Sequence, residues 1–573
     1  MANRLSQVVA QMDRLYEFDR EPVSPGKLQP ARHFAALLAG EHVAGTEFVI
    51  GALFVSWGAR PFDILVGLIV GNLLAVLTWT FVCTPIAIQT RLTLYWYLRR
   101  IAGPGTTAIY NVLNAILFCI LAGCMITVSA SSIRILFGIP PQTNWYPEDV
   151  RWVILVLALG AVVVGLAILG FKRLAQFAEV CSVWMFFMFV AGALALLPGL
   201  AAKSGLGEVR GLADFLALAE KTIWTGVAPA GQQSLTFWHI AAFAWICNLA
   251  MHGGLSDMAL FRYARSVSCG LTSAVGMFFG HYVAWICAGV MGAATALALN
   301  TTMDKLDSGT IAMEALGVAG GITVVLAGWT TSNPTLYRAG LAFQAVTPNW
   351  PRWLVTLLAG IATTIVATFP FVFTQLLNFV GWYGLLLMPV GAIVFVEHWI
   401  FPRIGLTQYW AARKGLIFNW PALGSWGLGI LVAWVLTHNG WLHLFFLFIP
   451  IWLLTAVLYT VLAALAGARV PVTEVPASAP VSPSAPLAER AEPPPAAAVP
   501  NGANGAWLWT SGVIALAALL VCIVLPIWHF AKGIEGCEER LAQLKSIILW
   551  ASLIHLTSAT IWAVQKEKSK SGF

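Results

Sequence analysis

The sequence predicts an all-α integral membrane protein in which two of the spanning helices are broken. Of its 573 residues, 59% are hydrophobic and 10% are charged, whereas about a quarter of the residues in a soluble domain are charged. Apolar runs of about 20 residues, the length that crosses a bilayer as a helix, recur along the chain. Two of these runs hold ionisable residues beside glycine, which is typical of a buried polar site because charge in a bilayer is costly.

The apolar runs predict twelve spans in a core and two more near the C-terminus. The core spans are expected near 34–58, 63–88, 106–138, 151–170, 175–198, 236–256, 268–298, 310–332, 352–373, 376–401, 420–437 and 441–467, and the later two near 506–530 and 546–564. With the N-terminus inside, the predicted cytoplasmic connections are basic and include Arg91, Arg262 and Arg338, as the positive-inside rule requires. The net charge of +7 then reports orientation in the lipid bilayer, and we expect no nucleic-acid partner.

Composition divides the chain into five segments. We expect a cytoplasmic N-terminal segment at 1–33, the twelve-span core at 34–467, a Pro/Ala-rich disordered linker at 468–505, two additional transmembrane helices at 506–565 and a basic cytoplasmic tail at 566–573. The first segment has no apolar run of signal-peptide length. We therefore expect a multi-pass protein of the plasma (inner) membrane with both termini in the cytoplasm. Its C-terminal hairpin should pack on the core or bind a protein partner.

The first span carries three ionisable residues around one glycine. Glu41, His42 and Glu47 flank Gly45, which we expect to weaken the helix and let its backbone open toward ions or substrate. Glu47 follows this break, so it is a candidate to bind a cationic or donor-rich substrate or to carry a coupling proton. Glu41 and His42 are candidates for coupling or gating. The alternative for Glu41 and His42 is structural pairing with each other or with a partner helix, and a structural role is the alternative for Glu47 as well.

The sixth span repeats this pattern. Its apolar half, which contains Asn248, runs into Gly253 and Gly254 and then into a polar segment with Asp257 and Arg262. Adjacent glycines weaken a helix, and spans one and six lie five apart, as expected for two five-helix units of inverted topology. This offset predicts a leucine-transporter-like five-plus-five inverted-repeat core. Asp257 and Arg262 are expected to form a gating or anchoring ion pair.

Three segments resemble one family of transporters. The second span, LIVGNLLAVLTWTF, with its exit TRLTLYWYLRRIAG, the eighth, GWTTSNPTLYRAGLAF, and the tenth, NFVGW, are similar to segments of the nucleobase:cation symporter-1 family, the purine, cytosine, hydantoin and allantoin permeases. The resemblance covers roughly residues 30 to 465. It implies a secondary active symporter that carries a nucleobase or a related small nitrogen heterocycle by alternating access. Na+ or H+ would be the coupling ion, with no organic cofactor.

The resemblance also implies a cation site in the eighth span. Ala327, Thr330 and Thr331 match the family's sodium-binding pattern of a small residue followed three and four positions later by hydroxyls. On a helix these positions share one face, and hard cations prefer oxygen ligands. The alternative is that the hydroxyls only close helix contacts within the membrane.

Three further residues are candidates for contacts to the heterocycle. Asn333 and Asn248 each offer an amide donor and acceptor for the edge of a ring, and Trp245 offers a face for stacking. The alternative for Trp245 is packing, since the chain has 26 tryptophans. In the third span, the segment NVLNAILFCILAGCMITVSASS carries Phe118 as its only aromatic residue where several members of the family have tryptophan, so one wall of a ring sandwich is expected to differ.

Two other classes of function compete with transport. A sensor or receptor derived from a transporter would signal through the C-terminal hairpin, and retained ligand binding without ion dependence would favour it. A membrane enzyme lacks support because the sequence shows no metal or nucleophile constellation and no phosphate-binding GxxxxGK[ST] loop. We therefore expect a non-enzymatic protein.

Overall fold

The computed structural model describes residues 20–142, 144–168, 171–228, 231, 233–347, 349–469 and 502–571. The predicted linker at 468–505 lies almost entirely outside these residues. Within them the α-helices are α2 (Ala31–His42), α3 (Thr46–Leu53), α4 (Pro61–Thr78), α5 (Thr84–Thr90), α6 (Leu94–Leu136), α7 (Val150–Ile168), α8 (Phe171–Ser204), α9 (Leu212–Thr222), α10 (Phe237–Ile246), α11 (Leu249–His252) and α12 (Met258–Phe261). They continue with α13 (Ser273–Val275), α14 (Trp285–Ala298), α15 (Ser308–Leu316), α16 (Val318–Val346), α17 (Arg352–Ala367), α18 (Val372–Phe395), α19 (Trp410–Arg413), α20 (Trp420–His438), α21 (Phe448–Ala463), α22 (Gly502–Ala531) and α23 (Cys537–Ser571).

Ten helices in the described part of the chain are long and apolar enough to cross a membrane, and the broken pair α2 and α3 makes eleven. This identifies a multi-pass membrane protein. Three of the fourteen predicted spans fall outside this set. The sixth and ninth correspond to helices of only 10 and 16 residues, α10 and α17. The eighth, α16, has 29 residues but a polar middle at 330–335.

The first span is broken as the sequence predicts. Its halves α2 and α3 are bent by 61°, and the backbone leaves the helical region at Val43, with φ −86° and ψ 64°. Gly45 lies in this break, between α2 and α3, but has helical angles itself, so the backbone departs from the helix at Val43 and not at the glycine. A Cβ atom at Gly45 would lie 2.8 Å from Val128 Cγ1 and 3.3 Å from the backbone nitrogen of Gly328. The glycine therefore allows close packing of the break on α6 and α16.

The sixth span is broken twice, between α10 and α11 and again before α12. Asn248 lies in the first break, with φ −113° and ψ 31°. His252 Nε2 donates to the Trp245 carbonyl across that break, at 2.9 Å. In the second break Leu255 adopts a left-handed φ of +65°, a conformation that is rare outside glycine and tends to mark functional sites.

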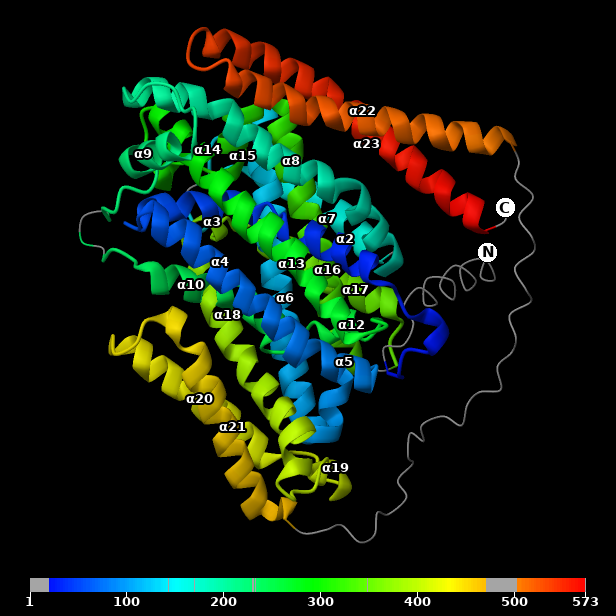
Figure 1. Cartoon of the computed structure of the whole chain (residues 1–573). Coiled ribbons are helices and arrows are strands. Elements are labelled where there is room, and N and C mark those ends of the chain that lie inside the picture. Colours follow the sequence, from blue (N-terminus) through cyan, green and yellow to red (C-terminus); the bar gives the residue numbers. More distant parts are fainter. Residues whose placement is uncertain are drawn as a thin grey trace.

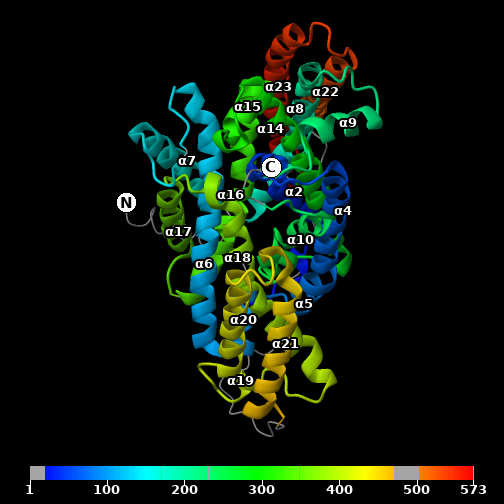
Figure 2. The same cartoon turned by 90° about the vertical axis from the view of Figure 1, so that its left-hand side faces the viewer.

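Helices α6 and α16 pack along each other at the centre of the molecule, with α7 and α17 on one side of α6 (Figure 2). Within α6, Gly103 has φ 77° and ψ 164°, so the segment predicted as the exit of the second span joins the third span across a kink. The hairpin of α22 and α23 runs along α8 at the top of Figure 1. Trp184 of α8 donates to Ser552 of α23 at 3.1 Å.

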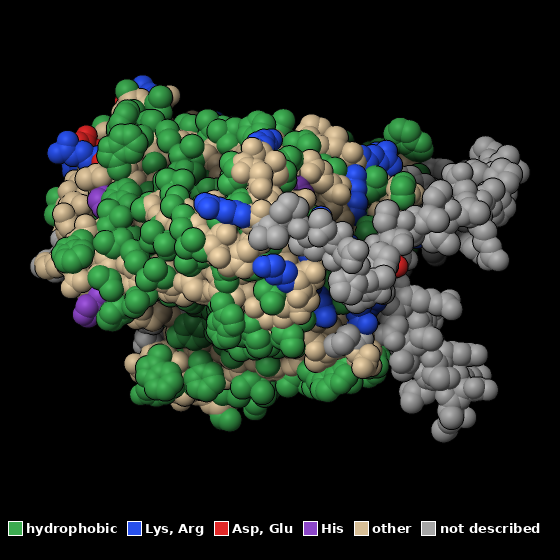
Figure 3. Space-filling model, turned by 90° about the horizontal axis from the view of Figure 1, so that it is seen from below, with side chains coloured by type: hydrophobic (Ala, Val, Ile, Leu, Met, Phe, Trp, Pro, Cys, Tyr) green, Lys and Arg blue, Asp and Glu red, His purple; other side chains and the backbone are tan. Residues whose placement is uncertain are grey.

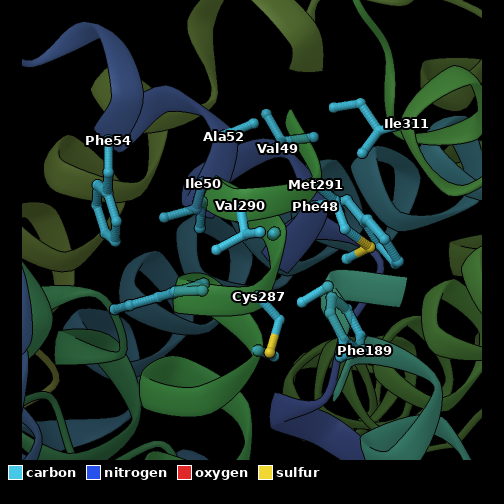
Figure 4. Packing of buried hydrophobic residues seen from close by; sticks show 14 of the residues in the cluster. Phe48, Val49, Ile50, Ala52, Phe54, Phe189, Cys287, Val290, Met291 and Ile311 are labelled. Carbon is cyan, nitrogen blue, oxygen red and sulfur yellow. The ribbon is translucent and has the colours of Figure 1, made fainter. Parts of the chain in front are cut away.

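Apolar packing holds the second half of the broken first span in place. Figure 4 shows α3 side chains among those of α8 and α14, and Phe48 stacks on Phe189 with ring centroids 4.2 Å apart. Gly51 faces α14, where a Cβ atom would collide with the Trp285 carbonyl. Because protein interiors are close-packed, this contact fixes α3 relative to α14.

Hydrophobic side chains cover a large part of the surface seen in Figure 3, and basic side chains are scattered over it, more of them from the middle of the view to the right. Such a surface fits a lipid environment, since soluble monomers rarely expose apolar patches of this extent.

Candidate functional site

The two broken spans enclose a small central cavity of about 40 Å³. Its polar lining comes from both breaks, from α16, from α18 and from the π-helical segment Gly276–Ala284 that precedes α14. These residues are Glu41, His42, Thr46, Glu47, Asn248, His281, Thr331, Thr335 and Tyr383. Its apolar lining includes Ile50, Leu121, Met125, Met251, Leu376 and Val380. This volume holds only a few water molecules, so the site is in a closed state.

Glu47 lies in the first turn of α3 and faces this cavity with 2% of its surface exposed. Trp285 Nε1 donates to Glu47 Oε2. His281 Nε2 lies 3.6 Å from Glu47 Oε1, and its ring stacks on Trp285 with centroids 4.3 Å apart. The carboxylate thus faces one indole and one imidazole across the cavity.

Two glycines bring His281 and its helix up to the end of α2. A Cβ atom at Gly276 would lie 2.7 Å from His42 Nδ1, and one at Gly280 would collide with the His42 carbonyl. His42 and His281 then meet edge to face, with centroids 5.1 Å apart. His42 Nδ1 lies 2.8 Å from the Leu38 carbonyl. Because a carbonyl only accepts, this nitrogen carries the proton, and in the neutral ring Nε2 is an acceptor.

A buried ionic triad joins both broken spans to α16. Arg338 Nη1 lies 2.5 Å from Glu41 Oε1, and Arg338 Nη2 lies 2.6 Å from Asp257 Oδ1. The three side chains are between 0 and 4% exposed. Trp79 of the second span donates to the other oxygen of Asp257 at 2.7 Å. The triad holds two carboxylates and one guanidinium, so its closed geometry depends on Arg338.

The predicted ion pair of Asp257 with Arg262 is not formed. Asp257 binds Arg338 and Trp79 instead, as described above, and Arg262 is directed to the Ala259 carbonyl and the Tyr263 hydroxyl. Glu41 has its partner on another helix, which agrees with the structural alternative for that residue. Arg338 lies within α16 and is fully buried, so its assignment to a cytoplasmic connection is wrong. Arg262 is also fully buried, but it follows α12 directly, at the start of the connection to the seventh span.

The predicted cation residues lie beside the break in span one. Thr331 Oγ1 lies 2.8 Å from the Glu41 carbonyl and 3.1 Å from the Ala327 carbonyl. Thr330 Oγ1 lies 3.1 Å from the same Ala327 carbonyl. Both hydroxyls thus donate to carbonyls, Thr331 to α2 as well as within α16, as the alternative of helix contacts predicts. The same four oxygens are of the kind that hard cations prefer, and the role of these residues in cation binding stays a prediction.

The predicted ring-binding residues separate into two groups. Asn248 lines the cavity, with its amide nitrogen 3.4 Å from His281 Nδ1. Trp245 and Asn333 are absent from the lining. The Trp245 indole donates to Thr78 Oγ1 at 3.0 Å. The Asn333 amide donates to the Trp329 carbonyl at 2.8 Å within its own helix.

This position of Trp245 leads to a prediction. Trp245→Phe should leave ligand affinity unchanged, because the side chain contacts Thr78 and, edge to face at 4.9 Å, Phe448 rather than the cavity. Loss of the hydrogen bond should cost about 1 kcal/mol of stability. Thermal unfolding with and without ligand measures both. A marked loss of affinity would return Trp245 to the binding site.

Sequence reasoning missed several residues of the site, namely Thr46, His281, Thr335 and Tyr383 in the lining, and Arg338 and Trp285 beside it. Arg338 was grouped with loop charges, although it lies seven residues after Thr331 and so on the same face of α16. His281 and Trp285 lie four residues apart in the seventh span, where a lone histidine in an apolar run is itself a signal. Nothing in the sequence indicates that Gly276 and Gly280 pack tightly against α2.

Comparisons with known proteins find likeness in structure alone. A scan against protein-family models and a search of curated proteins found no match. A closed, bromovinylhydantoin-bound structure of Mhp1, a nucleobase-cation-symport-1 family transporter, matches with a TM-score of 0.62 at 14% identity, over 80% of this chain and 98% of that chain. The inward-facing structure of Mhp1 matches with a TM-score of 0.60 at 14% identity, over 79% of this chain and 96% of that chain.

A substrate-bound, outward-open Na+-coupled sialic acid symporter matches with a TM-score of 0.54 at 13% identity, over 80% of this chain and 97% of that chain. All three alignments thus include nearly the whole of the other protein and leave about a fifth of this chain unmatched. The chain therefore has the fold of the transporter Mhp1, which confirms the leucine-transporter-like architecture and agrees with the family resemblance seen in the sequence.

Proposed function

We propose that this protein is a secondary active transporter, a cation-coupled symporter for a nucleobase or a related small nitrogen heterocycle. The observation that carries the proposal is the meeting of two broken spans and α16 at one buried polar cavity. In transporters of this architecture, substrate and ion bind where broken helices expose backbone groups. The likeness to Mhp1 in its closed and inward-facing states supports the same conclusion.

The mechanism follows from the contacts of the broken spans. Cation binding between the Glu41 carbonyl and the hydroxyls of Thr330 and Thr331 would hold α2 against α16. Substrate would bind on the other side of the break, at Glu47 and Asn248. Both ligands therefore favour the closed arrangement, and a ligand shifts an equilibrium toward the state that it binds best.

The membrane arrangement is part of the proposal. We propose residence in the plasma (inner) membrane with both termini in the cytoplasm, a core at 34–467 and an appended hairpin at 506–565. The contact of Ser552 with Trp184 supports docking of this hairpin on α8.

The coupling step yields a prediction. Thr331→Ala removes one hydroxyl ligand, so the Na+ concentration for half-maximal uptake should rise about tenfold, the worth of one such interaction. Purified protein in liposomes, given an inward Na+ gradient and labelled heterocycle, measures this. Thr331→Ser restores the hydroxyl and should behave as wild type.

Two other results would contradict the proposal. Uptake by Thr331→Ala with wild-type Na+ dependence would exclude this cation site. Ligand binding without uptake under any Na+ or H+ gradient would instead favour the sensor alternative, in which the hairpin on α8 responds to ligand.

A further inference from the structure

The Glu47 carboxylate has no strong cationic partner within the described part of the chain. The other carboxylates nearby behave differently, since Glu41 and Asp257 both bind Arg338 at 2.5 and 2.6 Å. Nearer the end of α6, Asp307 binds Arg134 at 2.6 Å. Glu47 has only His281, at 3.6 Å. A buried carboxylate of this kind is costly unless a counter-charge or a proton joins it.

The acceptor atoms of this site point into the cavity. Glu47 Oε2 already accepts from Trp285 Nε1, but Oε1 lies beyond hydrogen-bond distance from His281. His42 commits Nδ1 to the Leu38 carbonyl and offers Nε2 as an acceptor. Both residues line the same cavity. A ligand there therefore meets a carboxylate oxygen and a neutral imidazole nitrogen that N–H donors match, beside the polar side chains of Asn248, Thr331 and Tyr383.

The cavity walls give a flat neutral ring little support. Leu121 and Met125 form the α6 wall, and Met251 lies opposite on α11. Trp245 is turned toward Thr78, outside this lining. Aromatic faces hold rings by stacking, and only Tyr383 and the two histidines supply such faces here. Recognition at this site then rests mainly on charge and N–H donors.

We propose that the transported heterocycle carries a positive charge spread over N–H donors, as in an amidinium or guanidinium group, and that Glu47 is its counter-ion. This inference rests on the proposed function and specifies its substrate. Hydrogen bonds from a charged donor to a carboxylate are roughly twice as strong as neutral ones. The Trp285 contact to Oε2 holds the carboxylate with Oε1 toward the ligand.

A matched pair of small rings tests the proposal. 2-Aminoimidazole is a guanidinium-type cation at neutral pH. 2-Imidazolone has nearly the same shape and the same two ring N–H groups, but it is neutral and has a carbonyl oxygen in place of the amino group. Thermal shift of the purified full-length protein gives the affinity of each, because a ligand stabilises the folded state in proportion to its binding. Wild-type protein should bind the cation at least about tenfold more tightly, the difference that one charge-assisted bond makes.

Variants of Glu47 separate recognition from folding. Glu47→Gln keeps the size and the acceptor for Trp285 but removes the charge, so the two affinities should become equal. Glu47→Asp keeps the charge and should retain most of the preference. Glu220→Gln, at an exposed position in α9, is the matched control and should leave both affinities unchanged.

Each outcome bears on a different claim. Equal binding of the two rings by wild-type protein, or an undiminished preference in Glu47→Gln, would overturn the inference and leave the proposed function intact. The second result would identify Glu47 as a proton carrier or a packing residue. If neither ring binds, and no neutral nucleobase in the same screen binds either, the proposed function and the inference are both overturned.

Discussion

Arg338→Ala should abolish transport and destabilise the folded protein by about 3–5 kcal/mol, the cost of removing one partner from a buried ion pair. Arg338 is the only arginine that contacts the triad carboxylates in the described residues, and it binds Glu41 and Asp257 with no exposed surface of its own. Its loss leaves two carboxylates facing each other away from water. Thermal unfolding in detergent and uptake in liposomes measure the two effects.

A charge-neutral variant separates repulsion from lost contacts. Adding Glu41→Gln and Asp257→Asn to Arg338→Ala removes the unpaired charges, so most of the stability should return while transport stays lost. Arg403→Ala is the control, since that arginine is exposed and, among the described residues, contacts only the nearby Trp399, through its carbonyl and its ring. Wild-type stability of Arg338→Ala alone would mean that water reaches the triad and that its closed geometry is not maintained.

Gly280→Ala should reduce uptake by at least about tenfold, because the added methyl group occupies space held by the His42 carbonyl and overpacking a tight contact costs about 1–3 kcal/mol. The π-helical segment would have to move away from α2, which carries His281 out of reach of Glu47. We expect binding and uptake to fall together. Uptake at a fixed gradient and ligand-induced thermal shift are the measurements.

The control for this change is another helical glycine with free space. A Cβ atom at Gly424 in α20 meets nothing within 4 Å, so Gly424→Ala should keep full uptake and gain slightly in stability through helix propensity. If Gly280→Ala transports as well as Gly424→Ala, the approach of the seventh span to α2 is not needed for the cycle.

Local signals in the sequence predicted the broken spans because the bilayer leaves few explanations for buried charge beside glycine. The same signals could not give the rotation of a helix about its axis. Thr331 and Asn333 are two residues apart, and at 100° per residue they point to nearly opposite sides of α16. Thr331 lines the cavity, whereas the Asn333 amide donates to the Trp329 carbonyl. The sequence pattern predicted both residues as part of the site because it does not show which way each side chain points.

Long-range partners were the other part that sequence could not supply. Arg338 lies 297 residues from Glu41 and 81 from Asp257, and nothing local distinguishes it from a basic residue at the membrane edge. Its pairing depends on how three helices pack. The preference of Asp257 for Arg338 over the nearby Arg262 has the same origin, since proximity in the chain does not orient two side chains around a sharp break.

If the protein is the symporter proposed above, the shared arginine bears on how strictly the transport of ion and substrate is coupled. Since Glu41 belongs to the first span and Asp257 to the sixth, both broken spans share a single counter-ion. Movement of either span alone strands one carboxylate, so half-opened intermediates are disfavoured relative to states in which both spans move. In a symporter, such half-opened intermediates are the states through which an ion can cross the membrane without substrate. The triad thereby favours a fixed stoichiometry of ion to substrate, set by geometry rather than by the tightness of either binding site.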